Sequence, residues 1–349
     1  MSFASDNGAP AHPAVMDAML RANTGYTSGY GAEDDMQQVQ QTIRDLFEAP
    51  NAAVYLVSTG TAANALALAT MTKPWETIFC HRNAHIEEDE CGAPEFYTNG
   101  AKLTLVEGAD AMMTPENLQS AIEYTGRLGV HNVQRGSLSI TNVTEVGTVY
   151  SLDQIRALTK IARTGGVKTH LDGARFANAM VALNCTPAEM TWKSGVDAVS
   201  FGGTKNGCLG VEAVIFFDPE MAWEFELRRK RGGHLLSKHR LLSSQMQGYL
   251  ADDLWIDLAK RANAMGAKLA DGLSQTNDFE FMHPRHANMV FGRWPRATHD
   301  KLQASASKYY FWPADPAPKG PADEILSARL VCSWSTTDTE IDQFLGYFA

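Results

Sequence analysis

Short apolar runs alternate with helix-like segments through the larger, N-terminal part of the chain, and this alternation constrains the fold more than any other feature. The predicted strands cover 52–57, 78–80, 103–106, 138–142, 168–172, 198–201 and 213–217. Between them, 62–71 has strong helical character, and Ser151 or Asp153 is placed to cap a helix that ends near Arg163. Such an alternation predicts an α/β fold, with a mostly parallel sheet covered on both faces.

A single lysine stands in a glycine-rich loop at the end of one predicted strand. The stretch 199–210 reads VSFGGTKNGCLG, with glycines on both sides of Lys205. Glycine lets the backbone approach a ligand closely, so this lysine is positioned rather than loose in solvent. The stretch is not a phosphate-binding P-loop, because the required upstream glycine is absent and Asn206 replaces Ser or Thr. Taken alone, an ordinary surface lysine in a turn is the more common explanation.

Two further features fall at the ends of other predicted strands. Asp172 ends the run 168–172, and the turn 58–61, Ser-Thr-Gly-Thr, separates the run 52–57 from a helix. A turn of this kind exposes backbone N–H groups and the positive end of the helix to an anion such as phosphate. Ligands in parallel sheets bind beyond the carboxyl ends of the strands. The turn, Asp172 and Lys205 therefore predict one site, and together they suggest pyridoxal phosphate chemistry.

Charge and cysteine content limit the partners and the compartment. The 349 residues carry a formal net charge of −10, which argues against nucleic-acid binding, and the one basic cluster, 228–231, is too short to change this. Five scattered cysteines without a Cys-x-x-Cys pair indicate free thiols in a reducing cytoplasm. No apolar stretch approaches the ~20 residues of a membrane span, and no signal peptide is visible. We expect a cytoplasmic protein without nucleic-acid or membrane partners.

Two histidines, His81 and His85, precede an acidic run at 87–90. The second carboxylate–histidine pair that a convincing metal site needs is missing, so we expect no metal. The acidic run is expected to be solvated, and His85 is a candidate site residue.

From residue 279 the pattern changes to short strands at 289–292 and 328–333, a proline-rich loop at 313–321 and a last helix from Asp338. This change predicts a smaller α+β domain. We expect a large domain over 1–255 and a small domain over 256–349.

The chain resembles the threonine aldolases, within the fold-type-I pyridoxal-phosphate enzymes and near the β-eliminating lyases. The matching pieces follow the order of that family: Ser5-Asp6, Gly29-Tyr30-Gly31, 58–64, Ala84-His85, 172–175, 204–207, Arg229-Lys230 and 327–331. The resemblance implies a fold-type-I architecture, pyridoxal 5'-phosphate as cofactor, and a homodimer or homotetramer with active sites between subunits. It also implies that the N-terminal segment 1–25 contributes to the site.

The resemblance further implies a role for each matching residue. The cofactor would be held by Lys205 as a Schiff base, by Asp172 at the pyridine nitrogen, by His85 stacked on the ring, by Gly60 and Thr61 at the phosphate, by Lys230 of a neighbouring subunit, and by Arg175. The substrate carboxylate would be held by Ser5, Arg175 and Arg329. Catalysis would rest on Lys205, Asp172 and His85, with His85 as the base and Glu90 as a distant second candidate.

One stretch departs from the family pattern. The family commonly has Glu-Asn-Thr-His-Asn-Gly where this chain reads Thr-Asn-Val-Thr-Glu-Val-Gly at 141–147. A second active-site histidine is therefore missing, and the group that handles the substrate hydroxyl stays open.

Three functions remain. The first is retro-aldol cleavage of β-hydroxy amino acids, such as threonine, allo-threonine or phenylserine, to glycine and an aldehyde. The second is a pyridoxal-phosphate-dependent β-elimination or dehydration, for example of a hydroxyaspartate. The third is a non-catalytic binding protein on the same fold, which the intact Lys205 and Asp172 disfavour.

Overall fold

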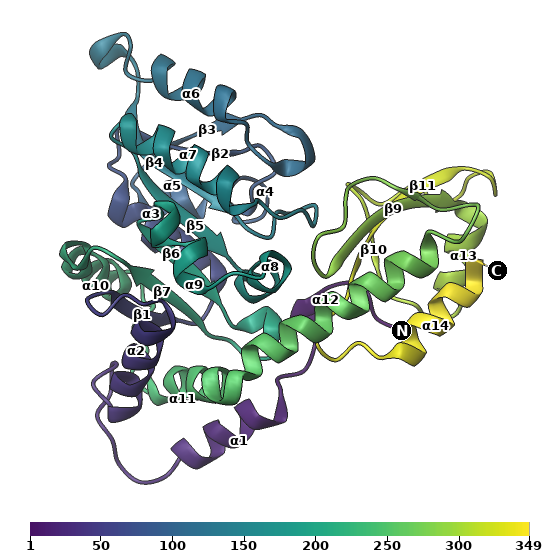
Figure 1. Cartoon of the computed structure of the whole chain (residues 1–349), viewed down its shortest axis with the longest axis horizontal. Coiled ribbons are helices and arrows are strands. Elements are labelled where there is room, and N and C mark those ends of the chain that lie inside the picture. The colour runs from purple at the N-terminus through teal and green to yellow at the C-terminus, as the bar shows by residue number, and fades with distance from the viewer. Residues whose placement is uncertain (349) are drawn as a thin grey trace.

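The computed structural model describes residues 1–348 and contains two sheets (Figure 1). The larger sheet has seven strands in the order β1-β7-β6-β5-β4-β2-β3. Their bounds are β1 Ala53–Val57, β2 Glu76–His81, β3 Lys102–Val106, β4 Gln134–Thr141, β5 Lys168–Gly173, β6 Ala198–Gly202 and β7 Glu212–Phe216. All neighbours pair in parallel except β7, which runs antiparallel to both β1 and β6. The predicted mostly parallel sheet is confirmed.

The direction of β7 follows from the length of its connection. The loop 203–211, which carries Lys205, is shorter than the dozen or so residues that a parallel crossover needs. The chain therefore turns back, and Glu212 at the start of β7 lies opposite both Val57 of β1 and Gly202 of β6. The amino end of β7 thus shares an edge with the carboxyl ends of β1 and β6, the edge where the sequence predicts the site.

Helices cover the sheet. They are α1 Pro13–Ala22, α2 Asp34–Leu46, α3 Gly60–Met71, α4 His85–Glu88, α5 Ala93–Tyr97, α6 Pro115–Tyr124, α7 Leu152–Thr164, α8 Phe176–Leu183, α9 Pro187–Met190, α10 Ala222–Arg231 and α11 Arg240–Leu250. Helix α3 is buried from Ala62 to Ala69, because its alanine and leucine side chains pack on every side. Helix α7 is capped by Ser151, one of the two predicted caps, through a reciprocal hydrogen-bond pair with Gln154.

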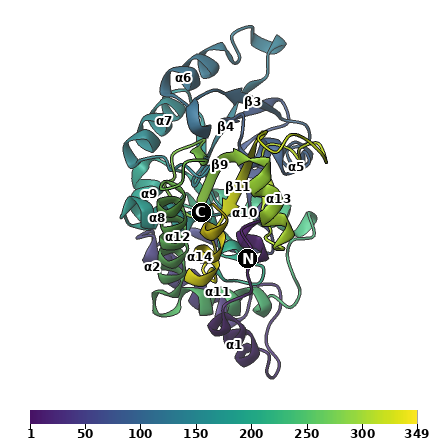
Figure 2. The same ribbon diagram turned by 90° about the vertical axis from the view of Figure 1, so that its right-hand side faces the viewer.

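The second sheet has four antiparallel strands in the order β10-β11-β9-β8. Its elements are β8 Glu280–Phe281, β9 Met289–Pro295, β10 Tyr310–Phe311 and β11 Ile325–Val331, with α12 Leu254–Leu273, α13 Arg296–Ala304 and α14 Asp338–Leu345. Helix α12 runs from the large sheet to the small one (Figure 1), and the turned view brings the second sheet and α12–α14 to the front (Figure 2). The predicted strands at 289–292 and 328–333 correspond to β9 and β11.

The N-terminal segment is anchored in the small domain. Phe3 is fully buried in the second core with Trp294 and Phe344. Its N–H donates to the carbonyl of Lys308 (2.7 Å), and its carbonyl accepts from the N–H of Val331 (2.8 Å). The chain then crosses to the large domain, where α1 packs against α11. Residues between Phe3 and α1 therefore lie between the two sheets.

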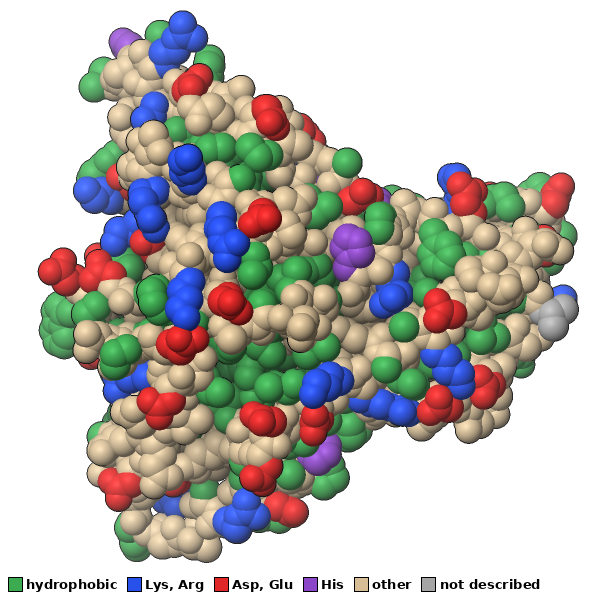
Figure 3. Space-filling model, viewed as in Figure 1, with side chains coloured by type: hydrophobic (Ala, Val, Ile, Leu, Met, Phe, Trp, Pro, Cys, Tyr) green, Lys and Arg blue, Asp and Glu red, His purple; other side chains and the backbone are tan. Residues whose placement is uncertain are grey.

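The surface mixes both signs of charge. Figure 3 shows acidic and basic side chains interspersed over the face toward the viewer. Within residues 1–348, no helix combines the length and the apolar character needed to cross a membrane.

Candidate active site

A cavity of about 410 Å³ lies where the edge of the large sheet that carries Lys205 meets the N-terminal segment and the small domain. It is lined by Ser2, Ala4, Ser5, Asn7, Gly8, His85, Asp89, Glu145, Arg175, Lys205, Tyr310 and Arg329. Five predicted site residues thus meet in one cavity: Ser5, His85, Arg175, Lys205 and Arg329. The other four predicted residues, Asp172, Gly60, Thr61 and Lys230, do not line it.

Lys205 stands in a short 3₁₀ turn, Thr204–Asn206, directly after β6. The turn lies close to its neighbours, since a Cβ at Gly202 would collide with the carbonyl of Ala174. Asn206 anchors it by donating to Tyr249 Oη and to the carbonyl of Trp255, both at 2.8 Å. The Lys205 amine itself has no hydrogen-bond or ion-pair partner in residues 1–348. The loop is therefore held firmly while its lysine remains available to a ligand.

Buried Glu212 lies at the base of the same loop. Its Oε2 accepts a hydrogen bond from the N–H of Gly203 (2.9 Å). Burial raises the pKa of Glu212 to about 7, and the charge of Asp172 adds to the rise, while hydrogen bonds and the charge of Lys205 oppose it. Glu212 thus lies next to the loop 203–211 that carries Lys205, which we call the lysine loop. The sequence did not indicate Glu212 as a site residue.

Asp172 is buried at the end of β5 and belongs to a hydrogen-bonded chain of side chains. Its Oδ1 accepts from the N–H of Ala174 (3.0 Å), and its Oδ2 accepts from Asn64 Nδ2 (3.1 Å). The Asn64 amide also donates to Glu90 Oε1 (2.9 Å), which lies 2.8 Å from His85 Nδ1. The predicted pair Asp172 and His85 is therefore connected through Asn64 and Glu90.

The position of Glu90 corrects one expectation. The acidic run was expected to be solvated, which is wrong for Glu90, because this residue is only 3% exposed. Its carboxylate can be buried since His85 and Asn64 supply hydrogen bonds. Burial raises the pKa of Glu90, and the charge of Asp172 acts in the same direction.

His85 holds its proton more firmly than an ordinary histidine. Burial alone would lower the pKa of His85, but the hydrogen bond to Glu90 and the nearby charges of Glu145 and Asp172 outweigh burial and raise it. Because Nδ1 is engaged with Glu90, only Nε2 of His85 remains to act on a ligand.

The amino end of α3 can receive an anion. The Thr59 side chain accepts from the N–H of Ala62, while the N–H groups of Gly60 and Thr61 have no acceptor within residues 1–348. A Cβ at Gly60 would meet nothing within 4 Å, so the space before the helix is open. Free N–H groups at a helix start suit a phosphate. Lys230 lies elsewhere: it is exposed on α10, with Nζ 4.8 Å from the centre of the Tyr30 ring.

The two predicted carboxylate-binding arginines differ in how their donors are used. Arg175 is buried, and its Nε and Nη2 donate to Asp6 at 2.7 and 2.9 Å. The side chain of Arg329 stacks on Tyr310 and Trp312, with 5.3 and 6.0 Å to the ring centres, and Nη2 donates to the carbonyl of Ala4 (3.2 Å). Arg329 Nε is buried without a partner in the described part of the chain. Arg329 therefore has more donor capacity left for a ligand than Arg175.

Several residues of the site were not predicted. Asp6 and Asn64 stood inside matching motifs without a role, and Tyr310 carried no signal. Glu145 follows the end of β4 by four residues, and its position beyond a strand end was the available signal.

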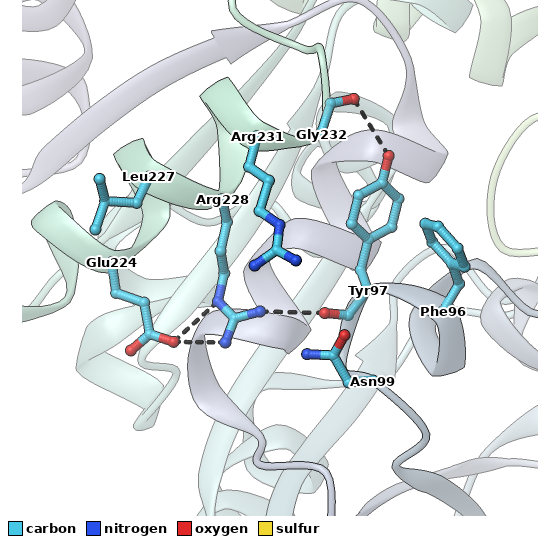
Figure 4. Close-up of a pocket in the computed structure, with 8 residues that line it drawn as sticks. All are labelled: Phe96, Tyr97, Asn99, Glu224, Leu227, Arg228, Arg231 and Gly232. Carbon is cyan, nitrogen blue, oxygen red and sulfur yellow. Dashed lines mark hydrogen bonds and ion pairs between the residues drawn. The ribbon is translucent and has the colours of Figure 1, made fainter.

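A larger cavity of about 530 Å³ lies between α5 and α10 (Figure 4). There Arg228 is held by Glu224 and by the carbonyl of Tyr97 (3.1 Å). Neither Lys205 nor any other predicted site residue lines this cavity. The chemistry of the lining, rather than the volume, identifies the smaller cavity as the candidate active site.

Known proteins resemble this chain over most of its length. The family profile described as beta-eliminating lyase matches residues 2–294. The chain belongs to this family. A low specificity L-threonine aldolase from Pseudomonas aeruginosa is 37% identical over 341 residues, which cover 98% of this chain and 94% of that protein. The resemblance stated from the sequence motifs is thereby confirmed.

Solved structures place this beta-eliminating lyase family member among fold-type-I pyridoxal-phosphate enzymes. The structure of Leishmania major threonine aldolase has a TM-score of 0.91 and 27% identity, covering 99% of this chain and 98% of that one. A serine palmitoyltransferase from S. paucimobilis with a bound PLP–myriocin aldimine has a TM-score of 0.70 at 16% identity, covering 100% of this chain and 86% of that one. The second similarity concerns the fold alone, and the predicted fold class is confirmed.

Proposed function

We propose that this chain is a pyridoxal-phosphate-dependent lyase that cleaves the Cα–Cβ bond of β-hydroxy-α-amino acids to glycine and an aldehyde. The observation that carries the proposal is the cavity in which the unpaired Lys205 faces His85 and Arg329. The similarity to curated low specificity L-threonine aldolases over nearly the whole chain supports the same reaction. Threonine, allo-threonine and phenylserine are the proposed substrates.

The residues present fit the cofactor. Lys205 offers an unpaired amine, the free N–H groups of Gly60 and Thr61 offer a phosphate site, and the carboxylate of Asp172 suits a protonated ring nitrogen. When bound there, pyridoxal phosphate supplies a sink for the electron pair released at Cα. His85 is proposed to lie against the ring.

The protein's own residues set which bond of the substrate breaks. Arg329 is proposed to bind the substrate carboxylate through its free donors, with Ser5 and the remaining Nη1 of Arg175 beside it. An arginine suits this task because its planar fork matches a carboxylate. A fixed carboxylate fixes the rotation about the bonds at Cα, and this rotation decides which bond breaks.

The test is to identify the products from a panel of threonine, allo-threonine and phenylserine. Retro-aldol cleavage gives glycine and the matching aldehyde in equal amounts. A β-elimination or dehydration gives ammonia and a keto acid without glycine, and this outcome would favour the alternative reaction. Borohydride reduction of the protein should fix the cofactor to Lys205, and a Lys205→Ala variant should yield neither glycine nor a reduced adduct.

Three further statements complete the proposal. The enzyme is a homodimer or homotetramer, with Lys230 reaching the phosphate site of a neighbouring subunit; its exposure outside its own cavity supports this. The domains divide at 255/256, close to the start of α12. The five free cysteines support a cytoplasmic location. A fully active monomer by light scattering would contradict the first statement.

A further inference from the structure

Glu145 lies in the wall of the active-site cavity with an unpaired carboxylate. The residue is 8% exposed and lines the cavity beside His85 and Lys205. No hydrogen bond or ion pair reaches its carboxylate from any residue in 1–348. Neither carboxylate oxygen is fully buried, so both stay accessible from the cavity. An accessible, unpaired carboxylate in the wall of an active-site cavity can accept a hydrogen bond from the substrate.

The turn that carries Glu145 is held from both domains. The N–H of Thr144 donates to the carbonyl of Thr148 (2.9 Å), and their hydroxyls lie 2.6 Å apart. Gly147 has φ +85°, a conformation that favours glycine, and its carbonyl accepts from the N–H of His286 in the small domain (3.3 Å). Glu145 is thus a positioned side chain and not a loose surface carboxylate.

The charges around Glu145 leave one kind of partner. Its carboxylate is close enough to influence His85, Arg175 and Arg329, yet it forms no ion pair with any of them. A β-hydroxy amino acid brings a carboxylate, an amino group and a hydroxyl. The substrate carboxylate pairs with Arg329, because the Glu145 carboxylate would repel it. The substrate amino group is placed at Lys205. The hydroxyl is the remaining donor for Glu145.

We propose that Glu145 is the catalytic residue that accepts the proton of the substrate hydroxyl, an assignment that rests on the proposed function. As the O–H bond breaks, its proton moves to a Glu145 oxygen and its electron pair forms the C=O bond of the aldehyde. The Cα–Cβ bond breaks, and its electron pair goes to Cα. A proton delivered to Cα completes glycine, and Glu145 releases its proton, so the cycle consumes none.

Two other groups in the cavity suit this role less well. His85 uses Nδ1 for Glu90, which leaves only Nε2 to act on a ligand. Asp89 is exposed at the cavity rim, where water competes for its carboxylate. Glu145 combines burial, free oxygens and a fixed position.

The experiment uses the cofactor-loaded enzyme with Glu145→Gln, which keeps the shape but cannot accept a proton. Glu87→Gln is the matched control, because Glu87 is exposed and does not line the cavity. Two rates are compared: cleavage of threonine, and exchange of the Cα proton of glycine with solvent, which involves no hydroxyl. Loss of general base catalysis should lower kcat for cleavage by about 100- to 10,000-fold. Glycine exchange and the visible cofactor band should stay within a few-fold of the wild type, as should both rates in Glu87→Gln.

Three outcomes would overturn the assignment. Unchanged cleavage in Glu145→Gln would exclude the base, and an equal loss of cleavage and glycine exchange would indicate a general structural role. Tighter substrate binding at unchanged kcat would make Glu145 a counter-charge for Arg175 and Arg329. A wild-type enzyme that produced no glycine from any β-hydroxy amino acid would contradict the proposed function itself. The Glu145 assignment is tested only by comparing the variant with an active wild type.

Discussion

Replacing Glu212 with glutamine should make the protein more stable at alkaline pH and leave its stability nearly unchanged at acidic pH. Glu212 is buried beneath the lysine loop, and burial is the main reason that its pKa rises from 4.5 to about 7. A group with a raised folded-state pKa contributes stability that is fully present below its unfolded pKa and is lost as pH rises through the folded value. The wild type should therefore lose stability between about pH 4.5 and 7.

The magnitude follows from the same rise. Each pKa unit corresponds to about 1.4 kcal/mol, so ionising Glu212 in place should cost about 3 kcal/mol. Glu212→Gln keeps an oxygen for the N–H of Gly203 but never ionises. Its advantage over the wild type should thus grow from about 1 kcal/mol at pH 5 to about 3 kcal/mol at pH 8.5.

The assay is urea unfolding of cofactor-free wild type and variant at a series of pH values, followed by circular dichroism. Glu220→Gln is the matched control, because Glu220 is exposed and its carboxylate has no hydrogen bond in the described residues. The difference between wild type and control should not change with pH. A Glu212→Gln advantage that is equally large at pH 5 and pH 8.5 would refute the reasoning, since it would not arise from ionisation.

Three shorter predictions concern the active site. Asp172→Asn should still bind cofactor, seen by absorbance, but lose most turnover, because the ring nitrogen is no longer held protonated; near-normal kcat would contradict this role. Arg329→Ala should lower kcat/KM by roughly ten- to a hundredfold, equally for threonine and phenylserine, since both present the same carboxylate; a loss with only one substrate would place Arg329 near the side chain. Glu90→Gln should lower the pKa of His85, measured by NMR titration, because that hydrogen bond helps to raise it; no change would show that Glu90 does not act on His85.

The alternation of strands and helices along the chain was sufficient to predict which edge of the sheet carries the site. Lys205 and Asp172 were found from the sequence because each lies at the end of a predicted strand, and the ends of parallel strands meet at one edge. The direction of β7 could have been inferred from its short connection, but the partners of Glu212 could not.

Pairings between distant residues could not be predicted in this way. Asp6 forms an ion pair with Arg175 although 169 positions separate the two residues in the sequence. No local sequence pattern reveals such a pair. Glu90 was wrongly expected to be solvated, because a charged residue in an acidic run gives no sign of the His85 that satisfies it. The resemblance to the threonine aldolases supplied part of this information, because it indicated site residues that lie far apart in the sequence.

The course of the N-terminal segment has a consequence for biosynthesis. Ser2, Ala4 and Ser5 form part of the cavity wall, but Phe3 between them is anchored to Lys308 and Val331, which are synthesised much later than Phe3. The large sheet can assemble while the chain is still growing, because its strands lie before residue 217. The cavity wall cannot, since its first residues must wait for β11. A nascent chain can therefore have a folded sheet while the loop 203–211 is still open, and the cavity is completed only after β11 has been synthesised.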